Sequence, residues 1–146
     1  MFLGQYEHAI DEKGRITIPS KFREDLGSSI YVTQGLDGNL QAFPPDLFNI
    51  MANQVRSLSY LDANSRKLRR ILFANAEKTS FDSAGRILLP AFLRETANLK
   101  DLALVVGSGE YFEIWSPEKW KAQQISLNDI EANEQRFSAL DLKTLQ

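Results

Sequence analysis

The amino-acid sequence contains one motif twice, and this repeat constrains the fold more than any other feature of the chain. Residues 11–23 read DEKGRITIPSKFR and residues 82–94 read DSAGRILLPAFLR. Six of the thirteen aligned positions are identical at a constant offset of 71 residues. Residue frequencies alone would give about one such match. The chain therefore contains two copies of one structural unit.

The similarity continues beyond the motif when the offset is raised to 72. The matching positions carry glycine, proline or large apolar residues: Gly35 and Gly107, Leu40 and Phe112, Phe43 and Trp115, Pro45 and Pro117, Phe48 and Trp120. We expect the recurring aromatic residues to pack in a core rather than stack on bases. We divide the chain into a first repeat with its following helices (1–75), a second repeat with its helix (76–125) and a polar, acidic tail (126–146).

Each copy of the motif predicts a tight turn between two short strands. Asp11 and Asp82 can bond the backbone of the turn, and Gly14 and Gly85 can adopt the positive φ that such a hairpin requires. Pro19 and Pro90 then end a strand and open short helices over residues 20–26 and 91–97, with Gly27 and Asn98 as left-handed C-caps. A second hairpin follows, over residues 30–43 and 102–115. These patterns predict a mainly β fold with α-helices, in which each half is a β-hairpin, a helix and a β-hairpin.

Helices are expected between the halves and after the second one. Pro45 opens the first helix, and Asp62 or Asn64 caps the second. The second helix has an apolar stripe, formed by Leu61, Leu68, Ile71 and Leu72, and a basic outer face, formed by Arg66, Lys67, Arg69 and Arg70. A further helix covers residues 118–124, and residues 126–146 are either helical or partly disordered.

Composition excludes several classes of function. The chain has no cysteine, which excludes disulfides and thiolate metal sites. It has one histidine, His8, so a Ser-His-Asp triad could be built only on that residue. We expect no enzyme activity, no catalytic or metal-binding residue and no cofactor. Neither a membrane span nor a signal peptide is recognisable, which predicts a cytoplasmic protein. With 17 basic and 19 acidic residues the net charge is −2, so any DNA-binding surface must be local.

Arg15 and Arg86 are the best candidates for such a surface. Each follows the hairpin glycine directly, and pseudo-symmetry would present both guanidinium groups on one surface. A guanidinium group can fork onto a phosphate or onto O6 and N7 of guanine. The alternative is structural: Arg15 pairs with Asp11 across the hairpin, and Arg23 pairs with a neighbouring acid. From composition alone the two interpretations have similar weight.

The two copies differ in charge. Lys13 and Lys21 lie in the first copy, where the second has Ala84 and Phe92, so we expect the first half to dominate any DNA contact. We interpret the basic helix face at residues 66–70 as a solvated surface rather than the main contact.

The doubled Asp-x-x-Gly-Arg-Ile-x-x-Pro-x-x-x-Arg pattern resembles the MraZ family of bacterial transcriptional regulators, over roughly residues 1–125. It is more distantly similar to AbrB and antitoxin-like DNA-binding domains. The resemblance implies a pseudo-symmetric swapped-hairpin β-barrel made by both halves, and protomers that assemble into a ring. It also implies a repressor that binds repeated promoter elements of the operon that encodes it, a cluster for division and cell-wall synthesis.

The resemblance assigns roles to the motif residues. Asp11, Gly14, Pro19, Asp82, Gly85 and Pro90 shape the loops. Together with the charge pattern it predicts a DNA-binding set of Lys13, Arg15, Lys21, Arg23, Arg86 and Arg94. The partners would be double-stranded DNA in the nucleoid and further copies of the chain. The rival function is a protein-interaction or assembly module, in which the same arginines face an acidic partner and the basic helix at residues 66–70 is the docking surface.

Overall fold

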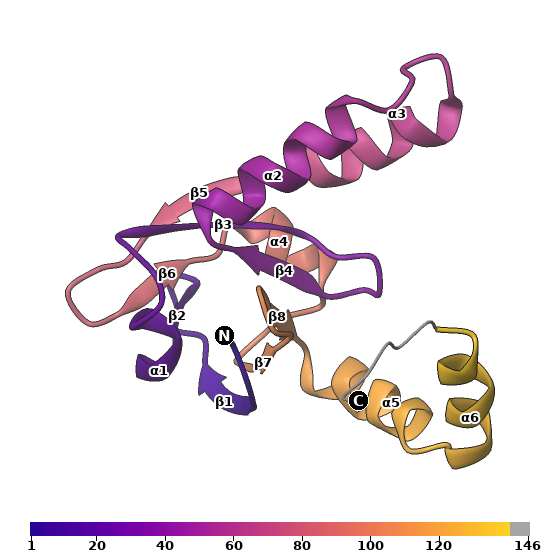
Figure 1. The fold of residues 1–146 in the computed structure, drawn as a ribbon. Coiled ribbons are helices and arrows are strands. Elements are labelled where there is room, and N and C mark those ends of the chain that lie inside the picture. Colours follow the sequence, from indigo (N-terminus) through magenta and orange to yellow (C-terminus); the bar gives the residue numbers. More distant parts are fainter. Residues whose placement is uncertain (141–146) are drawn as a thin grey trace.

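The computed structural model describes residues 1–140 and shows a β core that carries two pairs of helices (Figure 1). The strands are β1 (Gln5–Ala9), β2 (Arg15–Thr17), β3 (Ser29–Gln34), β4 (Leu40–Phe43), β5 (Glu77–Ser80), β6 (Arg86–Leu88), β7 (Leu102–Gly107) and β8 (Phe112–Trp115). The helices are α1 (Ser20–Arg23), α2 (Pro45–Arg56), α3 (Ala63–Arg69), the π-helical turn η1 (Arg70–Ala74), α4 (Ala91–Thr96), α5 (Pro117–Leu127) and α6 (Ile130–Ser138). No helix of this part of the chain is long and apolar enough to span a membrane.

The two halves exchange strands with each other. A six-stranded antiparallel sheet has the order β1-β7-β8-β4-β3-β5, and β2 pairs with β6 in a separate ribbon. In this order β1 of the first half pairs with β7 of the second, and β5 of the second half pairs with β3 of the first. A bridge between Ile10 and Ile16 joins the sheet to the ribbon. This crossed pairing confirms the mainly β fold with helices and two repeated halves; within residues 1–140 the paired strands form one sheet and one ribbon, and their pairings close no barrel.

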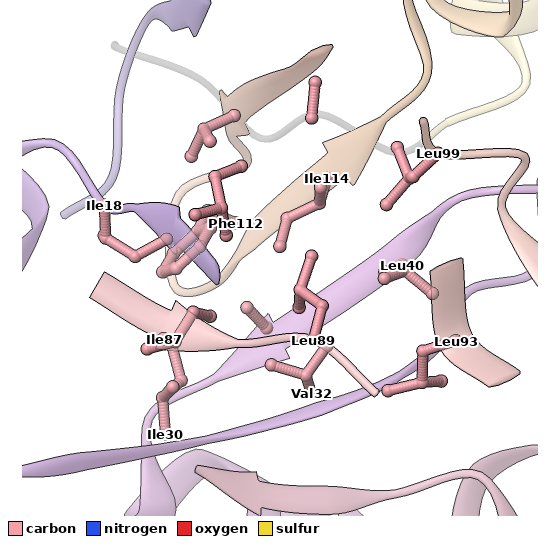
Figure 2. Packing of buried hydrophobic residues seen from close by; sticks show 14 of the residues in the cluster. Ile18, Ile30, Val32, Leu40, Ile87, Leu89, Leu93, Leu99, Phe112 and Ile114 are labelled. Carbon is pink, nitrogen blue, oxygen red and sulfur yellow. The ribbon is translucent and has the colours of Figure 1, made fainter. Parts of the chain in front are cut away.

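The core is formed jointly by the two halves. Ile16 and Ile18 of the first motif and Ile87 and Leu89 of the second are all fully buried. Figure 2 shows Ile18 and Ile87 in one cluster with Phe112, which belongs to β8. Because each half leaves its apolar face open until the other covers it, burial in this core favours the exchanged arrangement.

The recurring aromatic residues pack as predicted. Phe48 of α2 lies against Phe43, with ring centroids 6.2 Å apart, and Trp120 of α5 lies against Trp115 at 5.4 Å. All four side chains are buried. The helix that follows each second hairpin is therefore attached to the sheet by the same kind of aromatic pair.

Some predicted details are wrong. Helix α1 ends at Arg23, earlier than predicted, and Gly27 does not adopt positive φ, whereas Asn98 does, with φ of 54°. The starts of both helices are as predicted, with Pro19 and Pro90 at the N-cap position directly before Ser20 and Ala91. Leu61 is 76% exposed, because it lies in the turn before α3, and only Leu72 of the predicted stripe is buried.

The helices between the halves form an arm, defined here as residues 45–74, that projects from the sheet (Figure 1). Asp62 is the N-cap of α3, since its Oδ1 accepts a hydrogen bond from the backbone N–H of Asn64 at 2.8 Å. At the base of the arm the fully buried Thr33 of β3 donates a hydrogen bond to the carbonyl of Leu72 at 2.7 Å. Beyond α5, the predicted acidic tail is helical from Ile130 to Ser138, and its residues 141–146 lie outside the described residues.

Candidate nucleic-acid interface

The two motifs meet in the β2–β6 ribbon. Ile16 pairs with Ile87 at its centre, and both side chains are completely buried. Since side chains alternate along a strand, the residues on either side of each isoleucine point outward. This places Arg15 opposite Leu88 and Thr17 opposite Arg86 on one outward face. The predicted arginine pair is thus brought together on one surface.

The hairpin before β2 is organised by Asp11. Its Oδ1 accepts hydrogen bonds from the backbone N–H groups of Lys13 at 3.0 Å and Arg15 at 2.8 Å, and its Oδ2 accepts one from Nε of Arg15 at 2.7 Å. Gly14 has a φ of 86°, as predicted, which the turn requires. One carboxylate therefore shapes the turn and orients the guanidinium group beside it.

The hairpin before β6 repeats this geometry. Asp82 accepts from the backbone of Ala84 and Arg86 at 3.0 and 2.9 Å, and from Nε of Arg86 at 2.8 Å. Gly85 has a φ of 75°. Nη1 of Arg86 also lies 3.8 Å from Oδ2 of Asp11, so the two hairpins are in electrostatic contact across the ribbon.

Hydrogen bonding lowers the pKa of both aspartates. The backbone N–H of Arg15 is the largest cause for Asp11, and the backbone N–H of Arg86 is the largest cause for Asp82. Each arginine side chain contributes a further hydrogen bond and its positive charge. Hydrogen bonds to the ionised carboxylate stabilise it relative to the protonated form. Both aspartates therefore favour the charged form, which provides the counter-charge for the arginines.

Arg15 pairs with Asp11, as the structural alternative predicted, but its side chain remains partly exposed to solvent. The Arg15 and Arg86 side chains are 31% and 32% exposed. The bonds to the aspartates use Nε, so the Nη atoms that would fork onto a phosphate or a guanine are not used by them. Pairing with aspartate and binding to an anion are therefore compatible.

Arg23 and Arg94 cross to the opposite hairpin. Nε of Arg23 donates to the carbonyl of Ile18, and Nε of Arg94 donates to that of Leu89, both at 2.9 Å. The alternative that Arg23 pairs with an acid is wrong, since its partner is this carbonyl. Both side chains lie over glycines of the other motif. A Cβ on Gly14 would lie 2.8 Å from Nε of Arg94, and one on Gly85 would collide with the Arg23 guanidinium.

The lysines and their replacements are all exposed. Lys13 lies at the tip of the first hairpin and Lys21 in α1, and both are open to solvent. Ala84 and Phe92 occupy the matching positions of the second half and are also exposed, Phe92 at 43%. The matching exposed positions are therefore basic in the first half and apolar in the second.

The basic face of the arm is partly used by its own backbone. Nη1 of Arg66 donates to the carbonyl of Tyr60, and Nη2 of Arg69 donates to that of Arg56, both at 2.8 Å. Lys67 and Arg70 are exposed. Two of the four predicted basic groups thus help to hold the arm together.

Two residues of the ribbon face were not singled out in the sequence. Thr17 and Leu88 share this face with the arginines, and Leu88 is 50% exposed. The sequence alone does not show that a leucine in a short strand lies on a functional face, because this depends on its cross-strand partner. That partner, Arg15, lies 73 residues away and is set by the strand exchange.

Catalytic features are not apparent in residues 1–140. This part of the chain has no group of three or more His, Cys, Asp or Glu side chains placed to hold a metal ion. A cavity of about 730 Å³ is lined by residues 94, 95, 98–102 and 116–118. The hydroxyl of Ser116 in its wall accepts a hydrogen bond from the backbone of Lys119 as the N-cap of α5. That hydroxyl thus has a structural partner.

Known proteins resemble this chain along most of its length. The family model described as "MraZ protein, putative antitoxin-like" matches residues 1–71 and again residues 72–141. The transcriptional regulator MraZ of Roseiflexus castenholzii is 44% identical over 138 residues, which cover 94% of each chain. That of Thermomicrobium roseum is 49% identical over 123 residues, covering 84% of this chain and 87% of its own. That of Clostridium acetobutylicum is 38% identical over 142 residues, covering 97% and 100%.

These relatives are named as regulators, which confirms the expectation that the chain is not an enzyme. The family model matches both halves, and each half carries the same Asp-held arginine at the start of a ribbon strand. The chain therefore belongs to the MraZ family of transcriptional regulators.

Proposed function

We propose that this chain regulates transcription by binding DNA in a sequence-specific manner through the outward face of the β2–β6 ribbon. The observation that carries the proposal is the pair of arginines, Arg15 and Arg86, held by Asp11 and Asp82 on that one face. A guanidinium group that is already oriented loses less conformational entropy when it binds.

The dimensions of the ribbon suit the major groove. Each strand has three residues, so the ribbon is roughly 10 Å long at about 3.3 Å per residue. A two-stranded β-ribbon fits the major groove, which is about 12 Å wide, and there the edges of all four base pairs can be distinguished. We assign base contacts to Arg15 and Arg86, and phosphate contacts to Lys13 and Lys21. Arg23 and Arg94 add positive charge beside the same hairpins and support the glycine turns.

One ribbon makes few contacts, so binding gains from assembly. In a ring of identical protomers, several ribbons would engage successive promoter elements of the operon that encodes the protein. The second and later contacts then benefit from a high effective concentration. Occupation of these elements in the nucleoid would exclude RNA polymerase, and we therefore propose repression.

The first experiment is fluorescence anisotropy with the DNA upstream of the gene and a shuffled duplex of equal length, across a salt series. We expect tighter binding to the native duplex, and this preference should survive moderate salt. Equal and steeply salt-dependent binding to both duplexes would reduce the function to nonspecific charge attraction.

The second experiment replaces Arg15 by alanine. We expect operator affinity to fall by about tenfold to a hundredfold, the cost of one bidentate base contact, while the oligomer persists. Arg70→Ala, which removes an exposed arginine of the arm, is the matched control and should bind normally. Normal binding by Arg15→Ala would exclude the assigned role of Arg15.

The protein-interaction function has one observation in its favour, the exposed Lys67 and Arg70 on the arm. A pull-down from nuclease-treated lysate distinguishes the two functions. An acidic protein that is retained by the native chain but not by Arg70→Ala would support the interaction module.

A further inference from the structure

Leu88 lies between charged groups on the proposed DNA-binding face. Four side chains form this face in two cross-strand pairs, Arg15 with Leu88 and Thr17 with Arg86. Leu88 is 50% exposed, although the neighbouring Ile87 and Leu89 are completely buried. It therefore contributes apolar surface to an otherwise polar face and little to the core.

The two halves contribute the same residue type, arginine, at one position of this face and different residue types, Thr17 and Leu88, at the other. The pseudo-symmetry that relates the motifs exchanges Arg15 with Arg86 and Thr17 with Leu88. The flanking positions differ in the same sense, because Lys13 and Lys21 correspond to Ala84 and Phe92. At these three exposed or half-exposed positions the second half presents an apolar side chain, whereas the first half presents a polar or charged one.

We propose that Leu88 is a specificity-determining residue that contacts the 5-methyl group of a thymine next to the base pairs contacted by the arginines. This inference rests on the proposed DNA-binding function. In the major groove the thymine methyl is the apolar group that a side chain can contact, whereas the other base-edge groups are hydrogen-bond donors and acceptors. An exposed leucine on a ribbon in that groove has one complementary target.

The spacing fits this assignment. Residues directly opposite in an antiparallel pair have Cβ atoms about 5 Å apart, and successive base pairs are about 3.4 Å apart. When Arg15 reaches a guanine, Leu88 therefore lies over an adjacent base pair. Thr17 occupies the corresponding place beside Arg86, so the two halves of the ribbon would prefer different bases. A single protomer would then recognise a DNA element whose sequence is not palindromic.

The test compares the native upstream duplex with the same duplex in which deoxyuridine replaces every thymidine. This replacement removes the 5-methyl groups and leaves base pairing unchanged. We expect the wild-type protein to bind the uridine duplex about fourfold more weakly for each thymine methyl that Leu88 touches, from roughly 0.8 kcal/mol per buried methyl-sized group. Leu88→Ser should bind both duplexes equally, at the level of the wild type on uridine DNA.

Two further variants complete the design. Leu36→Ser removes a leucine that is 66% exposed in the turn between β3 and β4, and it should keep the full thymidine preference. Leu88→Thr copies the first half and keeps one methyl group, so it should show a reduced preference. This variant also serves if Leu88→Ser fails to fold by circular dichroism.

The outcomes separate this inference from the function on which it rests. Equal binding of the wild type to the thymidine and deoxyuridine duplexes, with a preference for both over shuffled DNA, would leave the proposed DNA-binding function standing and overturn the assignment of Leu88. A full thymidine preference in Leu88→Ser or Leu88→Thr also overturns it. A smaller oligomer with an unchanged preference would place Leu88 at a contact between copies. If the wild type does not prefer its upstream DNA at all, both proposals fail.

Discussion

Asp11 and Asp82 each perform two tasks at the scale of single residues. One carboxylate oxygen accepts the backbone N–H groups of the turn, and the other holds the arginine at the start of the strand. The shape of the turn and the direction of the guanidinium group are therefore linked, so a substitution of the aspartate should also change the proposed DNA-binding face.

Asp11→Asn tests this link. The amide oxygen can still accept from the backbone, but the counter-charge that holds Arg15 is removed. We expect operator affinity to fall several-fold, although removal of a negative charge would by itself favour DNA binding. Asp46→Asn removes an exposed carboxylate in the first turn of α2 and provides the control in the same anisotropy assay. Tighter binding by Asp11→Asn would show that Asp11 acts only through its charge.

The lowered pKa values of these aspartates predict acid sensitivity. A carboxyl group whose pKa is lower in the folded than in the unfolded state stabilises the protein above its ordinary pKa, here 3.8. That contribution is lost as the pH falls through the lower folded value. The double variant Asp11→Asn/Asp82→Asn should therefore lose less stability between pH 5 and pH 3. Thermal unfolding across this range measures the effect, and parallel curves for the two proteins would contradict it.

Arg23 and Lys21 are neighbours with different expected roles. Arg23→Lys keeps the charge but removes the planar group over Gly85 and the bond from Nε to Ile18. We expect it to reduce the free energy of unfolding by about 1–2 kcal/mol and to leave the salt dependence of DNA binding unchanged. Lys21→Ala should instead keep the stability and lower the salt slope by about one. Denaturant unfolding and salt titration distinguish them, and interchanged results would reverse the assignment.

At the scale of elements, the arm joins the sheet through η1. The Thr33 hydroxyl in β3 bonds the Leu72 carbonyl, and the Asn75 side chain donates to Gln34 at 2.6 Å. A π-helical turn moves its carbonyls out of the regular α-helical pattern, which makes them available to such partners. These polar contacts therefore fix the base of the arm to the strand, in addition to the aromatic packing of Phe48 in α2.

Thr33→Val should weaken this junction. It keeps the shape of the side chain and leaves the Leu72 carbonyl without its partner, which costs about 1–3 kcal/mol of stability. Amide exchange in α3 and η1 should rise more than exchange in β7. Thr96→Val, which removes an exposed hydroxyl bonded to Phe92 in α4, should have little effect. Equal effects of the two substitutions would exclude a special role for the junction.

At the scale of the whole molecule, strand exchange makes the halves interdependent. β1, β2 and β3 all pair with strands of the second half. A fragment of residues 1–75 should therefore have no folded monomer, because its core face lacks the Ile87 and Leu89 side of the cluster. Circular dichroism and analytical ultracentrifugation would show this, and a folded monomeric fragment would contradict it.

Assembly adds a prediction for DNA. If protomers bind successive elements together, a duplex with one promoter element should bind at least tenfold more weakly than a duplex with several. Anisotropy at equal protein concentration measures the ratio. Equal affinities per element would argue against multivalent binding.

The repeat, the hairpins and the aromatic helix anchors follow from the sequence because they are local. Turn chemistry, proline and two-residue periodicity act within a few positions, so Gly14, Gly85, Trp115 and Trp120 could be interpreted correctly from the sequence. The matching motifs also led to the family. The ends of the helices were less well predicted, since the end of α1 and the place of Leu61 depend on packing.

Tertiary structure alone decided the composition of the outward ribbon face that we propose binds DNA. The sequence placed arginine after each glycine, but only the pairing of β2 with β6 puts Leu88 opposite Arg15 and Arg23 over Gly85. Those partners are more than sixty residues apart in the chain. No local pattern encodes such contacts, because register across exchanged strands is set by burying Ile16 against Ile87 in a core that neither half can close alone.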